Sequence, residues 1–507
     1  MSICINRFGL ASLAIVGLAS YAYAQCQCTA PPPQSASVTT YHNDTLRTGW
    51  NQNETLLTAL NFPSSFGVRH TVSVDDQVDA QPLFMSAVSI AGGTHDVVYA
   101  VTESNTVYAI DAASGSILVS RNLGAPVPNP LGCGNNPPNI GTLSTPVIDP
   151  STHIMYVITY LNNGPSYKIW ALNISTLQDA IASTVVAASH TLVDGSTANF
   201  DASVQRQRAS LLLQDGVVYA GFTSFCDFAA NKSRGWILGW NANNLSPKAS
   251  NQLTDQLASG GFFLSAIWMS GYGIAGVSPN LYFSTGNSAS GTYTGTTNIQ
   301  ESIVSLNESN FSINSLFTPS DHDSMDDEDN DMGSGGVLVL PVQNLVVSAG
   351  KDGRLFLLSS TNLATPLATY SAGGGCWCGP SYFVGSDGIS RVVTSQGSTL
   401  ETWKVTASPS ALSAEFSKGI SNTAQDPGFF TSISSNKKVA GSAIIWSIGR
   451  GNPLMLSAFN ASGLGLLYSG NAGPYPNLGG NANIVPTVAN GRVYVGAYKT
   501  LTIFGVN

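Results

Sequence analysis

Charged residues, basic runs and long hydrophobic stretches are all scarce in this sequence of 507 residues. Asp, Glu, Lys and Arg together make up 10% of the chain, and the formal net charge is −9 at pH 7. An acidic chain without clusters of Lys and Arg is a poor ligand for nucleic acids and anionic membranes. Beyond the N-terminal region no run approaches the ~20 apolar residues of a membrane-spanning helix. The sequence therefore predicts neither nucleic-acid binding nor membrane insertion.

Two motifs of established chemistry are also missing. The chain has no C-x-x-C-H motif for haem attachment and no G-x-S-x-G motif around a nucleophilic serine. Its 6 histidines give no basis for a Ser-His-Asp triad. A hydrolase that uses an acidic loop is the only hydrolytic alternative that the sequence leaves.

The N-terminus has the pattern of a secretion signal. Arg7 precedes an apolar stretch at residues 8–20, and Ala22 and Ala24 fit the small-x-small rule for cleavage. We predict that residues 1–24 are a signal peptide cleaved near Ala24 and that 25–40, rich in Pro, Ser, Thr and Gln, form a disordered leader. The mature chain is expected to be secreted or periplasmic.

The most informative stretch is 97–115, VVYAVTESNTVYAIDAASG. Two runs of β-forming residues flank the polar turn at 103–105, and the second run ends in a turn that begins at Asp111. Weakened copies of this hairpin recur to the end of the chain and bring the total to eight. The later copies begin near Met155, Val218, Leu281, Leu345, Arg391, Ala443 and Arg492.

Eight such hairpins predict an all-β fold, an eight-bladed β-propeller of four-stranded antiparallel blades, with 41–507 as a single domain. Two β-sandwich domains would explain the β content but not a period that continues to the last residue. The last hairpin ends at Phe504 without an outer strand. We predict that residues 66–74 supply that strand, so that an N-terminal strand closes the ring in the last blade.

Strand order in such a propeller places the loops that lead into the innermost strands, and the turns within the hairpins, on one face, here called the top. Long loops at 125–144, 241–266, 287–301 and 315–333 belong to the same face, and such loops commonly carry function. The polar segment 41–51 is either a strap across one face or part of a site that contains His42, Asp44 and Arg47. Seven residues of the leading loops are candidates to line the top mouth: Arg206, Arg208, Trp268, Asp331, Cys376, Trp377 and Cys378.

Six cysteines remain after removal of the signal, and an even number in an exported chain favours disulfides. Four of them map to top-face loops and are the disulfide candidates, with a redox or metal role as the alternative: Cys133, Cys226, Cys376 and Cys378.

The repeat V-Y-A…V-Y-A-x-D-A-x-x-G, with K-D-G-R-L in a later copy, resembles the pyrroloquinoline-quinone-repeat propellers of the quinoprotein alcohol dehydrogenase-like superfamily. Blocks such as DAQPLF, QRASLLL, IWMSGYG, YFSTGN and DMGSGGVLVLP resemble a secreted branch whose activity is unassigned. Dehydrogenases of the superfamily stack the quinone on a Trp and against a disulfide of adjacent cysteines, beside a Ca²⁺ or lanthanide ion and a catalytic Asp. This chain departs from the pattern, with no Cys-Cys pair, Val119 in place of a usual Trp, and no cytochrome domain.

The candidate cofactor residues each have a structural alternative. Trp268 and Trp377 either form a stacking floor for a flat ligand or pack between blades. Arg208 either binds a ligand carboxylate or bonds between blades, as does Arg206. The resemblance implies that Lys351 reaches a quinone, although a tight turn explains it equally.

The acidic stretch 321–331 contains the alternating residues Asp327, Asp329 and Asp331, which match the start of a calcium loop. Met332 stands where the turn glycine of an EF-hand belongs, so the stretch is either a Ca²⁺ site of another kind or a solvated acidic loop. Asp331 directly precedes an innermost strand and is the candidate catalytic residue.

Two functions follow from these observations. The first is a non-catalytic binding propeller, monomeric, that takes a small molecule, glycan or protein at the top face and needs no cofactor. The alternative is an oxidoreductase that depends on pyrroloquinoline quinone and a metal and oxidises an alcohol or a sugar.

Overall fold

The computed structural model describes residues 37–133, 139–226, 234–249, 266–371, 374–376, 378–421, 428–476 and 484–506. The predicted signal peptide, most of the predicted leader and Trp377 lie outside these ranges. None of the helices in the described ranges has the length and hydrophobicity needed to cross a membrane. These helices are α1 (His322–Glu328) and the 3-10 turns η1 (Pro130–Gly132), η2 (Met269–Gly271) and η3 (Met332–Ser334).

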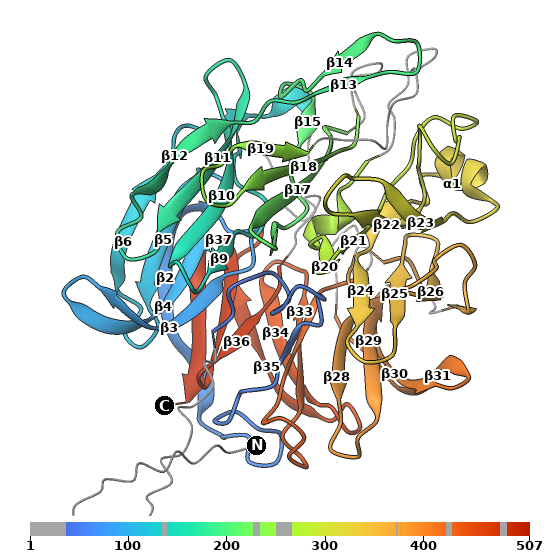
Figure 1. The fold of residues 1–507 in the computed structure, drawn as a ribbon. Helices are drawn as coiled ribbons and strands as arrows, with labels where there is room; N and C mark the ends of the chain where they lie inside the picture. The colour runs from blue at the N-terminus through green and yellow to red at the C-terminus, as the bar shows by residue number, and fades with distance from the viewer. Residues whose placement is uncertain are drawn as a thin grey trace, which may run out of the picture. The chain divides into compact units, whose positions relative to one another are not determined.

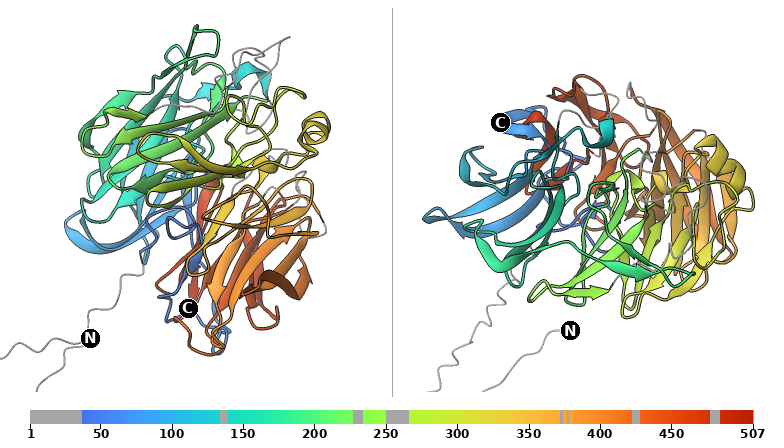
Figure 2. Two further views of the ribbon diagram at one scale, coloured as in Figure 1. Left: turned by 45° about the vertical axis from the view of Figure 1, so that its right-hand side comes forward. Right: turned by 90° about the horizontal axis from the view of Figure 1, so that it is seen from above.

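Eight antiparallel sheets follow one another around a ring, which confirms the predicted eight-bladed propeller (Figure 1). Seen from above, the colour passes once around the ring and the red C-terminal strand meets the blue N-terminal part (Figure 2, right). Blade 1 has β3 (Leu83–Ile90), β4 (Gly93–Val101), β5 (Thr106–Asp111) and β6 (Ile117–Asn122); blade 2 has β9 (Val147–Asp149), β10 (Ile154–Leu161), β11 (Ser166–Asn173) and β12 (Asp179–Val185); blade 3 has β15 (Gln205–Arg206), β16 (Leu212–Gln214), β17 (Val217–Ser224), β18 (Trp236–Asn241) and β19 (Pro247–Ala249); blade 4 has β20 (Ala275–Val277), β21 (Asn280–Ser284), β22 (Ile303–Asn307) and β23 (Ile313–Phe317).

The second half of the ring repeats this order. Blade 5 has β24 (Val337–Leu340), β25 (Leu345–Ala349), β26 (Arg354–Ser359) and β27 (Ala368–Ser371); blade 6 has β28 (Ser381–Val384), β29 (Ser390–Gln396), β30 (Thr399–Ala407) and β31 (Ser410–Gly419); blade 7 has β32 (Thr431–Ser434), β33 (Ile444–Gly449), β34 (Leu454–Asn460) and β35 (Leu466–Gly473), joined by β1 (Trp50–Asn51); blade 8 has β36 (Thr487–Ala489), β37 (Arg492–Val506) and β2 (Phe66–Gln77). Two small hairpins lie outside the blades, β7 (Val127–Pro128) with β8 (Asn139–Ile140) and β13 (Ser189–Thr191) with β14 (Thr197–Asn199).

Burial separates the outermost strand of a blade from the strands inside it. Every residue of β5 is buried, whereas the outer strand β6 has no buried residue. The apolar side chains of neighbouring blades form joint clusters, one of which contains Tyr99 of blade 1 and Trp170 of blade 2. Because both faces of the middle strands are covered, these strands read as continuous apolar runs rather than as alternating ones.

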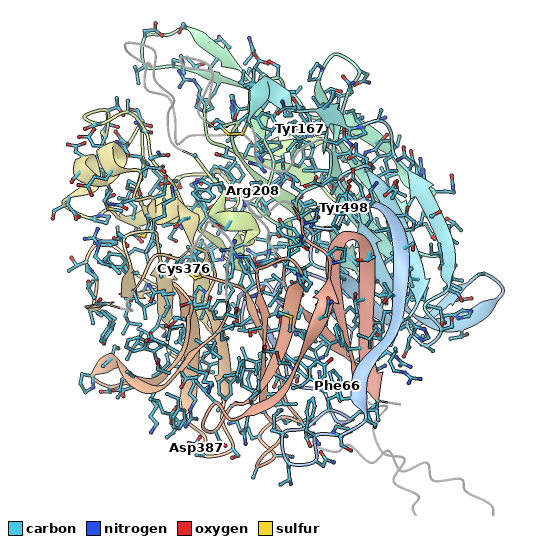
Figure 3. All side chains as sticks on the ribbon, turned by 180° about the vertical axis from the view of Figure 1, so that it is seen from behind. Phe66, Tyr167, Arg208, Cys376, Asp387 and Tyr498 are labelled. Atoms are coloured by element: carbon cyan, nitrogen blue, oxygen red, sulfur yellow. A yellow bond between two sulfur atoms is a disulfide. The ribbon has the colours of Figure 1, made fainter. Side chains whose placement is uncertain are left out.

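The N-terminal strand β2 closes the ring, as predicted. It pairs antiparallel with β37, with Phe66 opposite Val506 and Ser73 opposite Thr500. The strand β37 turns back on itself near Tyr498, so that its two arms are the middle strands of blade 8 (Figure 3). The two ends of the described chain thereby share one blade, and no blade is left with an open seam beside it.

Residues 38–51, here called the strap, run along the inside of the ring. Hydrogen bonds join the strap to the innermost strand, or the residue just before it, in every blade. From blade 1 to blade 8 the partners are Phe84, Ile148, Leu211, Gly276, Val339, Tyr382, Ile433 and Val488. Of the two interpretations of this segment, the structure supports the strap, and it places the strap inside the ring rather than across a face.

Arg47 and Tyr272 hold the strap at its centre. The Arg47 guanidinium donates from Nε to the Ile274 carbonyl at 2.8 Å and from Nη2 to the Leu211 carbonyl at 3.0 Å. Burial lowers the pKa of Arg47 to about 10. The Tyr272 hydroxyl lies 2.8 Å from the Arg47 carbonyl and 2.9 Å from that of Pro380. These bonds tie the strap to blades 3, 4 and 6 at once.

Candidate functional site

Two groups of polar side chains come together at the top face. The first, the arginine cluster, contains Asp79, Glu103, Arg206, Arg208, Arg450 and Tyr475, all of them buried. The second, the lysine–carboxylate cluster, contains Glu301, Asp329, Asp331 and Lys351.

Trp268 links the two clusters. The ring centroid of Trp268 lies 5.5 Å from the guanidinium carbon of Arg208 and 5.4 Å from Nζ of Lys351. Gly286 packs so closely that an added Cβ would lie 2.7 Å from Trp268 Nε1 and 2.9 Å from Asp331 Oδ1. The structure thus brings together four of the residues singled out from the sequence, Arg208, Trp268, Asp331 and Lys351.

Lys351 is the centre of the lysine–carboxylate cluster. It lies in the turn between β25 and β26, and its Nζ forms ion pairs with Asp329, at 2.9 Å, and with Asp331. Asp331 also accepts a hydrogen bond from the backbone N–H of Asn287 at 2.8 Å. Burial alone would lower the pKa of Lys351, but the two carboxylates raise it above its usual value. Lys351 is therefore a fixed cation.

The arginine cluster depends on an interruption in blade 3. The inner strand of that blade is split into β15 and β16, which both pair with β17. Arg206 ends β15, Arg208 lies in the interruption, and both are buried at the top of the ring. The Nε and Nη2 atoms of Arg206 are buried and have no hydrogen-bond partner among the described residues.

Glu103 and Asp79 form a pair of buried carboxyl groups within this cluster. Burial raises the pKa of Glu103 well above its usual value, and its hydrogen-bonded neighbour Asp79 raises it further. Burial also raises the pKa of Asp79, which Arg208 and Arg206 partly offset. Since two adjacent buried carboxylates repel each other, the charged form of Glu103 is disfavoured beside Asp79.

The four candidate cysteines form two disulfides in the structure. Cys133 pairs with Cys226, 93 residues away, with Cα atoms 5.7 Å apart, and Cys376 pairs with Cys378. The first disulfide joins the loop before blade 2 to the hairpin turn of blade 3, so it clamps two blades on the top face.

Solved structures with this architecture cover nearly the whole chain. The quinohemoprotein alcohol dehydrogenase from Comamonas testosteroni matches at 13% identity and a TM-score of 0.63, covering 93% of this chain and 80% of its own. The quinohemoprotein alcohol dehydrogenase ADHIIG from Pseudomonas putida HK5 gives 12% identity and 0.64 over the same shares. A europium-containing methanol dehydrogenase gives 11% and 0.63, covering 93% of this chain and 98% of its own. No protein-family model and no curated protein matches the sequence.

The chain has the fold of the quinoprotein alcohol dehydrogenases. At these identities the likeness concerns the fold alone, so the residues of the mouth must show whether they fit a quinone and a metal. The positive charges of Arg208 and Lys351 beside Trp268 fit a flat ligand that carries carboxylates. The same two cations already lie close to the ring, and a stacked quinone would have to share it with them.

The predicted metal ligands do not come together as a set. Asp327 is exposed on α1, whereas Asp329 and Asp331 meet at Lys351. The ammonium group of Lys351 thus sits between the two carboxylates that a Ca²⁺ ion would need. Ligand atoms of His322, Asp323 and Asp326 lie within 4.8 Å of one another, but these groups are not among those predicted from the sequence.

Several buried residues of the mouth were missed by the sequence analysis. Glu103 lies in the hairpin turn of blade 1, Asp79 precedes the leading loop of blade 1, and Asn287 and Glu301 bound a long top-face loop. The prediction that hairpin turns lie on the top face could have indicated Glu103. The candidates for the mouth were taken only from the leading loops, which do not contain that residue.

Asp326 should give the protein a measurable dependence on pH. Burial, with Asp323 and Asp331 nearby, raises its pKa to about 7 from an ordinary value of 3.8. Its protonated form is therefore favoured in the folded state, and its contribution to stability is lost as pH rises from about 4 to about 7. We expect Asp326→Asn to gain stability relative to the wild type across that window. Urea unfolding at pH 4.5, 5.5, 6.5 and 7.5 measures this difference.

The matched control is Asp327→Asn, because Asp327 is the neighbouring exposed residue of the same helix. Its stability relative to the wild type should stay constant over the same pH range. A constant difference for Asp326→Asn as well would contradict the raised pKa.

Proposed function

We propose that this chain is a secreted or periplasmic propeller that binds a small polar molecule at the top mouth without converting it chemically. The observation that carries the proposal is a set of buried polar atoms on this face that lack hydrogen-bond partners among the described residues. They are Glu103 Oε1 on blade 1, Arg206 Nε and Nη2 on blade 3, and both amide atoms of Gln396 on blade 6.

Unpartnered buried groups of this kind destabilise the folded state. Each costs about 1–3 kcal/mol, and native proteins contain only a few of them. The three residues named above belong to blades that are far apart in the sequence, yet they lie on one face, although the described residues hold further unpartnered polar atoms elsewhere, such as Gln343 Oε1. A ligand that offers several donors and acceptors would recover this cost, and this supports a polar ligand rather than an apolar one.

The state of Asp331 supports binding rather than catalysis. Both of its carboxylate oxygens are occupied, one by Lys351 and the other by the N–H of Asn287. A general base needs a free lone pair directed at the substrate. To act as the base, Asp331 would have to use a second lone pair on an oxygen that Lys351 or the Asn287 N–H already occupies.

The alternative is an oxidoreductase that uses pyrroloquinoline quinone and a metal to oxidise an alcohol or a sugar. The adjacency of Trp268, Lys351 and Asp331 favours it, because these residue types surround the quinone in the dehydrogenases that the sequence resembles. The fold that the chain shares with such enzymes is compatible with either function.

A thermal-shift experiment separates the two. We would test pyrroloquinoline quinone with Ca²⁺, and a panel of small polar molecules, against the wild type, Gln396→Met and Trp268→Ala. Binding to the native state raises Tm by mass action. The proposal expects a stabilising polar molecule whose effect falls in Gln396→Met, and no reduction of an electron acceptor by alcohols or sugars with the quinone and Ca²⁺ present.

Gln343→Met is the control, because Gln343 lies on the opposite face, between β24 and β25. It should leave the thermal shift unchanged. A shift given only by the quinone, lost in Trp268→Ala and accompanied by substrate-dependent acceptor reduction, would establish the oxidoreductase instead. The absence of a shift with any compound would overturn both functions.

A further inference from the structure

We propose that the ligand of the top mouth carries a carboxylate and that Arg206 binds it through its Nε–Nη2 edge. The inference rests on the proposed binding function and names the chemical class of its ligand. Arg206 is only 2% exposed, and these two donors are the ones that lack partners.

The same chain shows what this edge of an arginine does when a carboxylate is available. On blade 6, Arg391 donates from Nε to Glu415 Oε2 at 2.7 Å and from Nη2 to Glu415 Oε1 at 2.9 Å. This is the two-pronged geometry in which a guanidinium fits a carboxylate. Arg206 presents the same pair of atoms, buried, without the carboxylate.

The arginine cluster contains more cations than carboxyl groups. Burial and the neighbouring Asp79 raise the pKa of Glu103 and so disfavour its charged form. Glu103 and Asp79 are the two carboxyl groups of the cluster, against the cations Arg206, Arg208 and Arg450. Positive charge therefore exceeds negative charge in this buried cluster, and an anionic ligand is favoured over a neutral one.

Glu103 narrows the chemical class of the ligand further. Its Oε1 is a buried acceptor without a partner, and Arg206 lies within electrostatic reach of it. A ligand hydroxyl or ammonium group beside the carboxylate would satisfy this oxygen. Small hydroxy acids and amino acids have both groups, whereas simple fatty acids have only the first.

The experiment is calorimetric titration with lactate, alanine, propionate, lactamide and pyrroloquinoline quinone. The proteins are the wild type, Arg206→Lys and Arg206→Gln, with Arg121→Gln as a surface control. The wild type should bind lactate or alanine about 100-fold more tightly than lactamide, the loss expected when two charge-assisted hydrogen bonds disappear. Arg206→Lys keeps the charge but not the two-pronged geometry, and should weaken lactate binding at least tenfold. Arg121→Gln should change nothing.

The outcomes distinguish this inference from the function on which it rests. If lactate and lactamide bind alike and Arg206→Lys has no effect, the mouth binds small molecules but the carboxylate is wrong. If only the quinone binds, and Arg206→Lys weakens it, the arginine holds a carboxylate that belongs to a cofactor rather than to a small acid. If the wild type binds none of the compounds, and Gln396→Met binds none of them either, the inference and the binding function both fail. Circular dichroism of Arg206→Lys confirms that a loss of binding is not a loss of fold.

Discussion

Replacement of Arg47 by methionine should lower the free energy of unfolding by about 3–5 kcal/mol. The variant removes the donors to the Ile274 and Leu211 carbonyls, and to the Tyr41 carbonyl at 2.8 Å, all buried. Each acceptor left without a donor costs about 1–3 kcal/mol. Part of this cost is offset, because burial of the Arg47 charge is itself unfavourable and lowers its pKa to about 10. Urea unfolding followed by tryptophan fluorescence measures the net change.

Arg121→Met is the matched control for this prediction. Arg121 also donates to a carbonyl, that of Leu177 at 2.7 Å, and pairs with Asp179, but it does so at the surface. Exposed interactions of this kind contribute about 0–1 kcal/mol. If Arg47→Met were no more destabilising than Arg121→Met, the strap would not depend on the guanidinium for its place inside the ring.

The strap explains why the loss of one side chain, that of Arg47, destabilises the whole ring. Its hydrogen bonds reach all eight blades, whereas each blade otherwise contacts mainly its neighbours. Arg47 joins segments 164 and 227 residues away in the sequence. Contacts over such separations are entropically costly to form, and their loss therefore removes a constraint that no local interaction replaces.

The sequence was sufficient for the fold because the fold is made of repeated local patterns. Each hairpin can be recognised from two β-forming runs and the polar turn between them, as at 97–115. Eight copies of this pattern determine the architecture. The closing strand was also predictable, because Phe504 ends the third strand of the last blade and a propeller must fill the fourth position.

The site was less predictable because its geometry depends on contacts between blades. The sequence indicated Arg208, Trp268, Asp331 and Lys351 separately, but not that Lys351 would hold Asp331. The alternation of Asp327, Asp329 and Asp331 assumes an extended chain. The structure instead forms α1 over His322–Glu328, which leaves Asp327 on the helix surface. A local pattern could not reveal that a lysine twenty residues later would take the position between two carboxylates.

Replacement of Phe66 by alanine should cost about 3–5 kcal/mol, the range for a buried phenylalanine. Phe66 begins β2 and packs against Tyr468 at 5.0 Å, Trp446 at 5.7 Å and Phe504 at 6.2 Å between ring centroids. The ring seam, where β2 pairs with β37, joins strands from opposite ends of the chain. Chemical denaturation measures the loss of stability, and hydrogen exchange locates it.

Phe416→Ala tests whether the position at the seam matters. Phe416 lies on the outer strand β31 of blade 6, which is continuous in sequence with the strand it pairs with. Its loss should speed exchange locally. Phe66→Ala should instead speed exchange along the whole of β2 and the paired arm of β37, because Phe66 packs at the start of the only pairing between these two strands. An opened seam exposes an unpaired edge of β37, so the variant should also aggregate in a concentration-dependent manner. Exchange confined to Phe66 and its neighbours would mean that the strap, rather than the seam, keeps the ring closed.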